Sequence, residues 1–99
     1  MYAVFRETSY LPGTKIEDTT AFIEFQDKHA KQAGYKGTVV TDAGEGHYLT
    51  VTLWEDEKAM NDARKELGPL VEKLLSPIMT SQAKLIGAGI VVINDIKEL

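Results

Sequence analysis

The 99-residue sequence contains no cysteine. This absence excludes disulfide bonds, thiolate metal sites and cysteine nucleophiles. It fits a reducing compartment, and residues 1–10 lack the basic region and apolar run of a secretory signal peptide. We therefore expect a cytoplasmic protein.

Positive charge is also scarce, with 11 Lys and Arg against 15 Asp and Glu and a net charge of −4. A nucleic-acid partner is not expected, because phosphate backbones require a dense basic patch. A membrane partner is not expected either. The longest apolar run, near 85–93, is broken by Gly87 and Gly89 and is far shorter than the ~20 residues of a bilayer span.

Motifs for metal, phosphate and serine chemistry are missing. His29 and His47 fall on separate predicted elements without a metal-binding spacing. The glycines at 87–89 lie inside a predicted strand and not before a helix, and no Gly-x-Ser-x-Gly elbow occurs. We expect neither a metal nor a cofactor.

What the sequence does contain is a regular alternation of strand-like and helix-like segments, which predicts one domain over 1–99. Strand composition is found at 2–8, 35–44, 46–55 and 84–94. Helical periodicity is found at 17–33 and then, as two pieces or one kinked helix around Gly68–Pro69, at 57–67 and 69–77.

Local signals mark the ends of these elements. Thr14 and Glu17 have capping-box spacing at the start of the first helix, and Gly34 ends it. The glycines of 43–46 predict a hairpin turn, and Asp56 is a plausible N-cap for the second helix.

The resulting order is β-α-β-β-α-β, the ferredoxin-like pattern of an antiparallel sheet with helices on one face only. The first and last strands are apolar on both sides, with Ile86, Ala88 and Ile90 expected together on one side of the last. In 46–55, one side carries Tyr48, Thr50, Thr52 and Trp54, and the other carries Leu49, Val51 and Leu53. We expect one of these sides to pack on the sheet of a second subunit in a homodimer.

Residues 29–75 and 85–95 resemble the antibiotic biosynthesis monooxygenase-like family of dimeric α+β barrel proteins. The resemblance rests on "GYKG" at the second strand, on the third strand ending in Trp54 and Glu55, and on the helix that follows. It implies two ferredoxin-like subunits packed sheet to sheet, each with a pocket between its sheet and its helices. Heme-degrading members carry an iron-ligating histidine in the second helix; this chain has none there, which argues against that role.

Some members of the family oxidise aromatic polyketides or quinols with dioxygen and without metal or flavin. This chain is therefore expected to be a cofactor-independent monooxygenase of an aromatic phenol or quinol. The alternatives are a non-catalytic small-molecule-binding or stress-associated barrel and a subunit that merely assembles into a larger complex.

His29 is the leading site candidate, because it shares a helical face with Phe22, Phe25 and Ala33 and titrates near neutrality. It is either a base for a phenolic substrate or a histidine at the edge of the core. Tyr35 and Tyr48 are candidate hydroxyl donors to the substrate or half-buried strand residues. Candidate substrate-binding residues are Phe25, Trp54, Asn61 and Arg64; Trp54 could instead be a packing residue, and Asn61 and Arg64 could form a solvated helix face.

Overall fold

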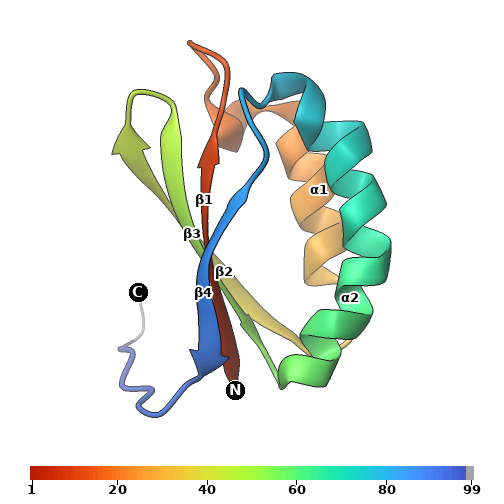
Figure 1. Cartoon of the computed structure of the whole chain (residues 1–99), viewed down its shortest axis with the longest axis vertical. Coiled ribbons are helices and arrows are strands. Elements are labelled where there is room, and N and C mark those ends of the chain that lie inside the picture. The colour runs from red at the N-terminus through yellow and green to blue at the C-terminus, as the bar shows by residue number, and fades with distance from the viewer. Residues whose placement is uncertain (98–99) are drawn as a thin grey trace.

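The structure, a computed structural model, describes residues 1–97 and places one layer of helices against one sheet (Figure 1). The strands and helices follow the predicted βαββαβ order, so the ferredoxin-like fold is confirmed. No helix within this part of the chain is both long and apolar enough to cross a membrane. The elements are β1 (Tyr2–Ser9), α1 (Thr20–Ala30), β2 (Tyr35–Gly44), β3 (His47–Trp54), α2 (Glu57–Leu70) and β4 (Lys84–Ile90).

The sheet has the antiparallel order β2-β3-β1-β4. Both helices cover the same face of it (Figure 1). Trp54 and Thr52 of β3 are buried on the helix-facing side, so this side of β3 belongs to the core and cannot meet a second sheet. Leu49 and Val51 occupy the opposite, uncovered side, so of the two sides predicted to meet a second subunit only this one remains available.

The core lies between the sheet and the helices in two clusters of buried side chains. The larger cluster consists of Val4, Phe25, Trp54, Met60, Ala63, Leu67 and Leu75. The smaller one, at the other end of β3, consists of Tyr10, Ile16 and Tyr48. These clusters anchor both helices and leave the far side of the sheet without a covering layer.

The first helix is shorter than predicted. A separate 3-10 turn spans Ile16–Asp18, and α1 runs only from Thr20 to Ala30, so it also ends before the predicted end at 33 and Gly34 is not its C-cap. The predicted capping box of Thr14 and Glu17 is wrong, because Lys15 precedes the 3-10 turn and has no side-chain cap. The hydroxyl of Thr19 instead donates to the Lys15 carbonyl at 2.7 Å, closing a turn that separates the two helical segments.

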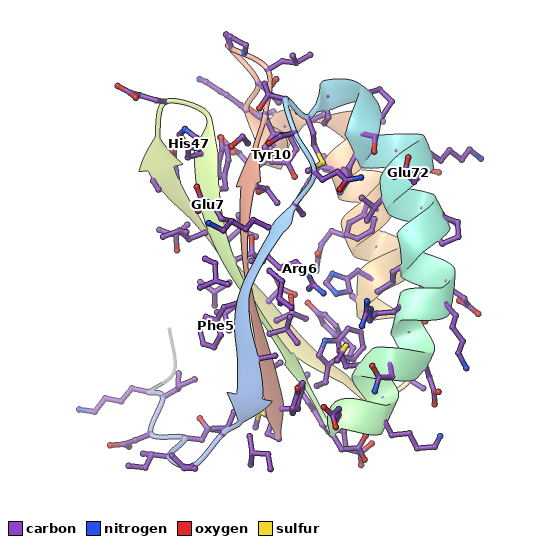
Figure 2. The ribbon with its side chains drawn as sticks, in the orientation of Figure 1. Phe5, Arg6, Glu7, Tyr10, His47 and Glu72 are labelled. Atoms are coloured by element: carbon purple, nitrogen blue, oxygen red, sulfur yellow. The ribbon has the colours of Figure 1, made fainter. Side chains whose placement is uncertain are left out.

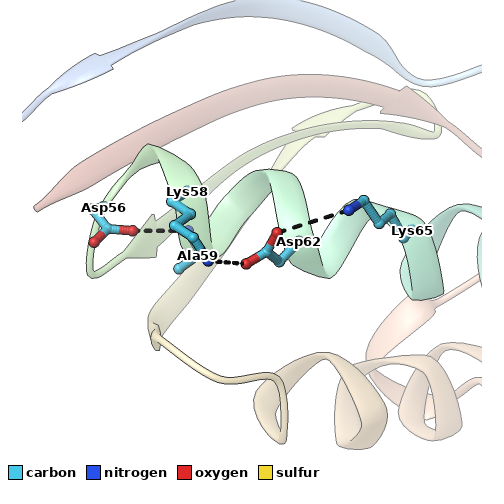
Figure 3. Close-up of polar contacts among 5 residues, drawn as sticks. All are labelled: Asp56, Lys58, Ala59, Asp62 and Lys65. Atoms are coloured by element: carbon cyan, nitrogen blue, oxygen red, sulfur yellow. Dashed lines mark hydrogen bonds and ion pairs between the residues drawn. The ribbon is translucent and has the colours of Figure 1, made fainter.

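The second helix begins as predicted at Asp56, whose carboxylate accepts a hydrogen bond from the Ala59 backbone at 2.8 Å (Figure 3). Lys58 and Lys65 contact Asp62 on its exposed side (Figure 3). The N-cap satisfies a backbone donor that the helix itself leaves unpaired.

Pro69 does not break this helix. The chain continues from Leu70 into a π-helical turn, Val71–Leu75, and a 3-10 turn, Ser76–Ile78. Since proline removes one backbone donor, the hydrogen-bond spacing changes while the helical path is kept. Within this wider turn Leu75 is buried, whereas Leu74 is half-buried.

The last strand ends earlier than predicted, at Ile90, and the Val91 backbone bonds Met1 at 2.8 Å. Residues 92–94, predicted as strand, lie outside the sheet. A bulge opposite Phe5 and Arg6 changes the alternation of β4. Leu85 therefore pairs with Arg6 and shares a face with Ala88 and Ile90, whereas Ile86 does not. The predicted grouping of Ile86 with Ala88 and Ile90 was wrong, because the regular alternation of a strand does not include a bulge.

Candidate functional site

His29 lies on the buried face of α1 among three aromatic rings. Its side chain is only 8% exposed. The ring centroid is 5.4 Å from that of Phe25, 5.0 Å from Tyr35 and 5.6 Å from Trp54. The fold therefore gathers four of the predicted site residues, from α1, β2 and β3, into one aromatic cluster.

A chain of hydrogen bonds orients the imidazole ring. His29 Nδ1 is 3.2 Å from Gln26 Oε1, and Gln26 Nε2 donates to the Tyr35 hydroxyl at 2.9 Å. Tyr35 in turn donates to Thr38 Oγ1 at 2.7 Å. Because the Gln26 amide donates to Tyr35, its oxygen faces His29, which places the ring proton on Nδ1 and the free lone pair on Nε2.

The cluster keeps His29 neutral. Burial, together with the positive charge of Arg6, lowers the pKa of His29 from 6.5 to about 4. Desolvation penalises the imidazolium form, and the guanidinium repels it. At neutral pH the ring is an uncharged hydrogen-bond acceptor at Nε2.

Sequence reasoning missed three residues of this region: Gln26, Thr38 and Arg6. Gln26 could have been found, because it lies one helical turn before His29. Thr38 could not, since strict alternation would place it on the opposite side of β2 from Tyr35. Arg6 follows Tyr2 and Val4 in the alternation of β1 and was overlooked as a charged residue in an apolar strand; Figure 2 shows it between the sheet and the helices.

Three other predicted residues lie outside the aromatic cluster. Tyr48 packs edge-on against Tyr10 in the smaller core cluster, with ring centroids 5.5 Å apart. Six residues of strand separate it from Trp54, or about 20 Å. Asn61 and Arg64 lie on the exposed side of α2. The fold therefore does not bring Tyr48 to His29.

Two hollows are found elsewhere on the surface. One, of about 540 Å³, lies between the end of α1 and the start of α2 and has a charged lining that includes Lys31, Glu55 and Glu66. The other, of about 260 Å³, lies on the uncovered side of the sheet between Phe5 and Leu49. His29 lines neither. Within residues 1–97, no group of three or more His, Asp or Glu side chains is placed to hold a metal ion.

Comparison with known proteins gives the fold a family context. No protein-family model matches the sequence, and no curated protein matches it. The cofactor-independent oxygenase SnoaB from Streptomyces nogalater matches with a TM-score of 0.69 and 17% identity, covering 97% of this chain and 98% of that one. A structure named antibiotic biosynthesis monooxygenase matches with a TM-score of 0.72 and 15% identity, over 94% of this chain and 100% of that one.

A protein of unknown function from Nitrosomonas europaea has the same architecture, with a TM-score of 0.75, 9% identity and coverage of 98% of this chain and 94% of that one. The chain thus has the ferredoxin-like fold of antibiotic biosynthesis monooxygenases. At these identities the likeness concerns the fold, and the reaction must be argued from the side chains.

Proposed function

We propose that this protein is a cofactor-independent monooxygenase that oxidises an aromatic phenol. The observation that carries the proposal is the neutral His29 ring, held with its Nε2 lone pair free among Phe25, Tyr35 and Trp54. A buried, uncharged acceptor suits a hydrogen bond from a phenolic hydroxyl. The likeness to a solved cofactor-independent oxygenase supports the same assignment.

In the proposed reaction the phenol loses its proton, and the phenolate transfers an electron to dioxygen. The resulting radicals combine at an unsubstituted ring carbon para to the oxygen. One oxygen atom stays on that carbon as a carbonyl, and the other leaves as water with the ring hydrogen and the phenolic proton. The protein supplies orientation and a dry environment, and dioxygen is the only oxidant.

His29 alone is a weak acceptor for the first step. A simple phenol has a pKa of about 10, against about 4 for His29. Direct transfer would be uphill by about six pKa units, or about 8 kcal/mol. His29 therefore serves chiefly as a hydrogen-bond acceptor that orients the phenol, and the phenolate needs further stabilisation.

Oxygen uptake with a panel of para-unsubstituted naphthols tests the proposal. We expect turnover by the wild type that falls at least tenfold in His29→Gln and is unchanged in His47→Gln, since His47 lies on the uncovered side of the sheet (Figure 2). Equal rates for wild type, His29→Gln and buffer would rule out the proposed reaction.

One observation favours the alternative of ligand binding without catalysis. The hydroxyl proton of Tyr35 is engaged by Thr38, and Trp54 is 2% exposed, so these two groups offer little to a reacting substrate. Thermal shift measurements with flat aromatics distinguish the two functions. Stabilisation without oxygen uptake supports binding alone, and stabilisation with uptake supports the oxygenase.

We also propose that two copies pack through the uncovered sheet face. This face carries Phe5 and Leu49, which are 46% and 44% exposed, beside Val39, Val51 and Ile86. Burying such apolar area contributes about 25 cal/mol per Å². A homodimer would give each sheet the second covering layer that its own helices do not provide.

A further inference from the structure

Arg6 is a positive charge in a partly buried position that forms no ion pair within residues 1–97. It projects from the inner strand β1, and the sheet register places it between Thr50 of β3 and Leu85 of β4. Figure 2 shows its side chain on the helix side of the sheet. None of the ion pairs or side-chain hydrogen bonds among residues 1–97 includes Arg6.

The charged and titratable groups that influence Arg6 do not neutralise its positive charge. Burial, and to a smaller extent the positive charge of Arg64 of α2, lowers the pKa of Arg6. His29 of α1 is in turn disfavoured as a cation by Arg6. On the strands, the flanking Thr50 and Leu85 carry no charge. Two cations and a neutral imidazole thus create a positive potential that an incoming anion would relieve.

The edge strand β4 provides a route by which a ligand can reach Arg6. On β4, Leu85 and Ile90 share the face of Arg6 by register, yet they are 59% and 77% exposed. The helices therefore leave this edge of the sheet open on the helix side, where β4 lies at the margin (Figure 1). The exposed strip Leu85–Ala88–Ile90 is apolar, and Leu85 at one end of it pairs with Arg6 in the sheet register. Such a combination suits a ligand with one flat apolar part and one anionic oxygen.

We propose that Arg6 binds the oxyanion of an aromatic phenolate whose ring lies along Leu85–Ala88–Ile90. This inference rests on the proposed function, because it concerns the same substrate class and identifies what stabilises the phenolate. The phenolic proton leaves to solvent, so His29 need not hold it. The guanidinium compensates for the weak basicity of His29 by favouring the ionised substrate.

The probe is 4-nitrophenol, whose ionised form is identified by its visible absorption. We would titrate it against the protein under nitrogen between pH 5 and pH 8, and separate the bound and free forms by varying the protein concentration. Since an opposite charge a few Å away lowers a pKa by about 1–3 units, the bound probe should ionise at least tenfold more readily than the free probe. Ionisation at the same pH as in water, or no binding at millimolar concentration, would overturn the proposal.

Substitutions identify the residue responsible. Arg6→Met should abolish the ionisation shift, and Arg6→Lys should retain part of it. Lys84→Met is the matched control: it removes a positive charge from β4, but from the opposite face, where Lys84 pairs with Glu7. It should leave the shift intact. A shift that persists in Arg6→Met would refute the assignment.

The melting temperature of Arg6→Met, compared with that of the wild type, shows whether this variant is folded. Removing an uncompensated cation next to Arg64 should leave the melting temperature of Arg6→Met at or above that of wild type. If Arg6→Met does not fold, Arg6→Gln provides the same comparison. Because dioxygen is excluded, the outcome is separate from turnover: a retained shift without oxygen uptake contradicts only the oxygenase, and uptake without a shift contradicts only the role of Arg6.

Discussion

Tyr35 donates a hydrogen bond to Thr38, three residues further along the same strand, at 2.7 Å. In a regular strand these side chains would point to opposite faces. A register shift between Tyr35 and Gly37 inserts one residue and turns Thr38 to the helix side. This bulge completes the chain Thr38–Tyr35–Gln26–His29, so an irregularity of β2 sets the orientation of a ring on α1.

Replacing Tyr35 by Phe should destabilise the protein by about 1–2 kcal/mol, because Gln26 and Thr38 each lose a partly buried partner. Tyr2→Phe removes an exposed hydroxyl bonded to Glu57 and should cost distinctly less. Urea denaturation monitored by Trp54 fluorescence measures both. Equal losses of unfolding free energy for the two variants would show that the hydrogen-bond chain through Tyr35 adds nothing to stability.

Stability should fall as the pH is lowered from 7 to 4. The pKa of His29 is about 4 in the folded protein and 6.5 in an ordinary environment, so the unfolded chain binds this proton first. The stabilisation is fully present above pH 6.5 and is lost toward pH 4, by about 3 kcal/mol. Unfolding free energies at intervals of half a pH unit test this. His29→Gln should remove most of this slope and His47→Gln should not; identical profiles for wild type and His29→Gln would contradict it.

Gly34→Ala should be more damaging than Gly13→Ala, although both glycines have φ +81°. A Cβ at Gly34 would lie 2.5 Å from Cβ of Ala59, whereas one at Gly13 would meet nothing within 4 Å. Positive φ alone costs alanine about 1 kcal/mol. With the displacement of α2 added, we expect about 2–4 kcal/mol for Gly34→Ala. Comparing the melting temperatures of Gly34→Ala and Gly13→Ala isolates the effect of the contact with Ala59. Equal melting temperatures would mean that α2 accommodates the added methyl group without cost.

Leu49→Lys should separate the proposed dimer. Leu49 lies on the uncovered sheet face, and a charge buried between two sheets is strongly unfavourable. Ile23→Lys is the control, because Ile23 is 54% exposed on α1, on the opposite side of the molecule. Analytical ultracentrifugation at micromolar concentration should find the wild type and Ile23→Lys as dimers and Leu49→Lys as a monomer. A monomeric wild type would disprove the arrangement.

Much of the fold was determined by the sequence alone. The order of elements, the Asp56 cap and the burial of His29 follow from local signals: hydrophobic period, helix caps and backbone preference. Each depends on residues a few positions apart, so each can be read without knowing the partner strand or helix. The apolar excess of the sheet is likewise a property of its composition.

Only the tertiary structure decided which side of β3 faces the helices and where the strands bulge. These features depend on pairing between segments far apart in the chain, and one inserted residue reverses which side chains share a face. The bulge in β2 brings Thr38 to Tyr35, and that in β4 brings Leu85 to Arg6. The environment of Arg6 is equally non-local, because it depends on which side chains β3, β4 and the helices bring near it, and none of the ion pairs within residues 1–97 includes Arg6.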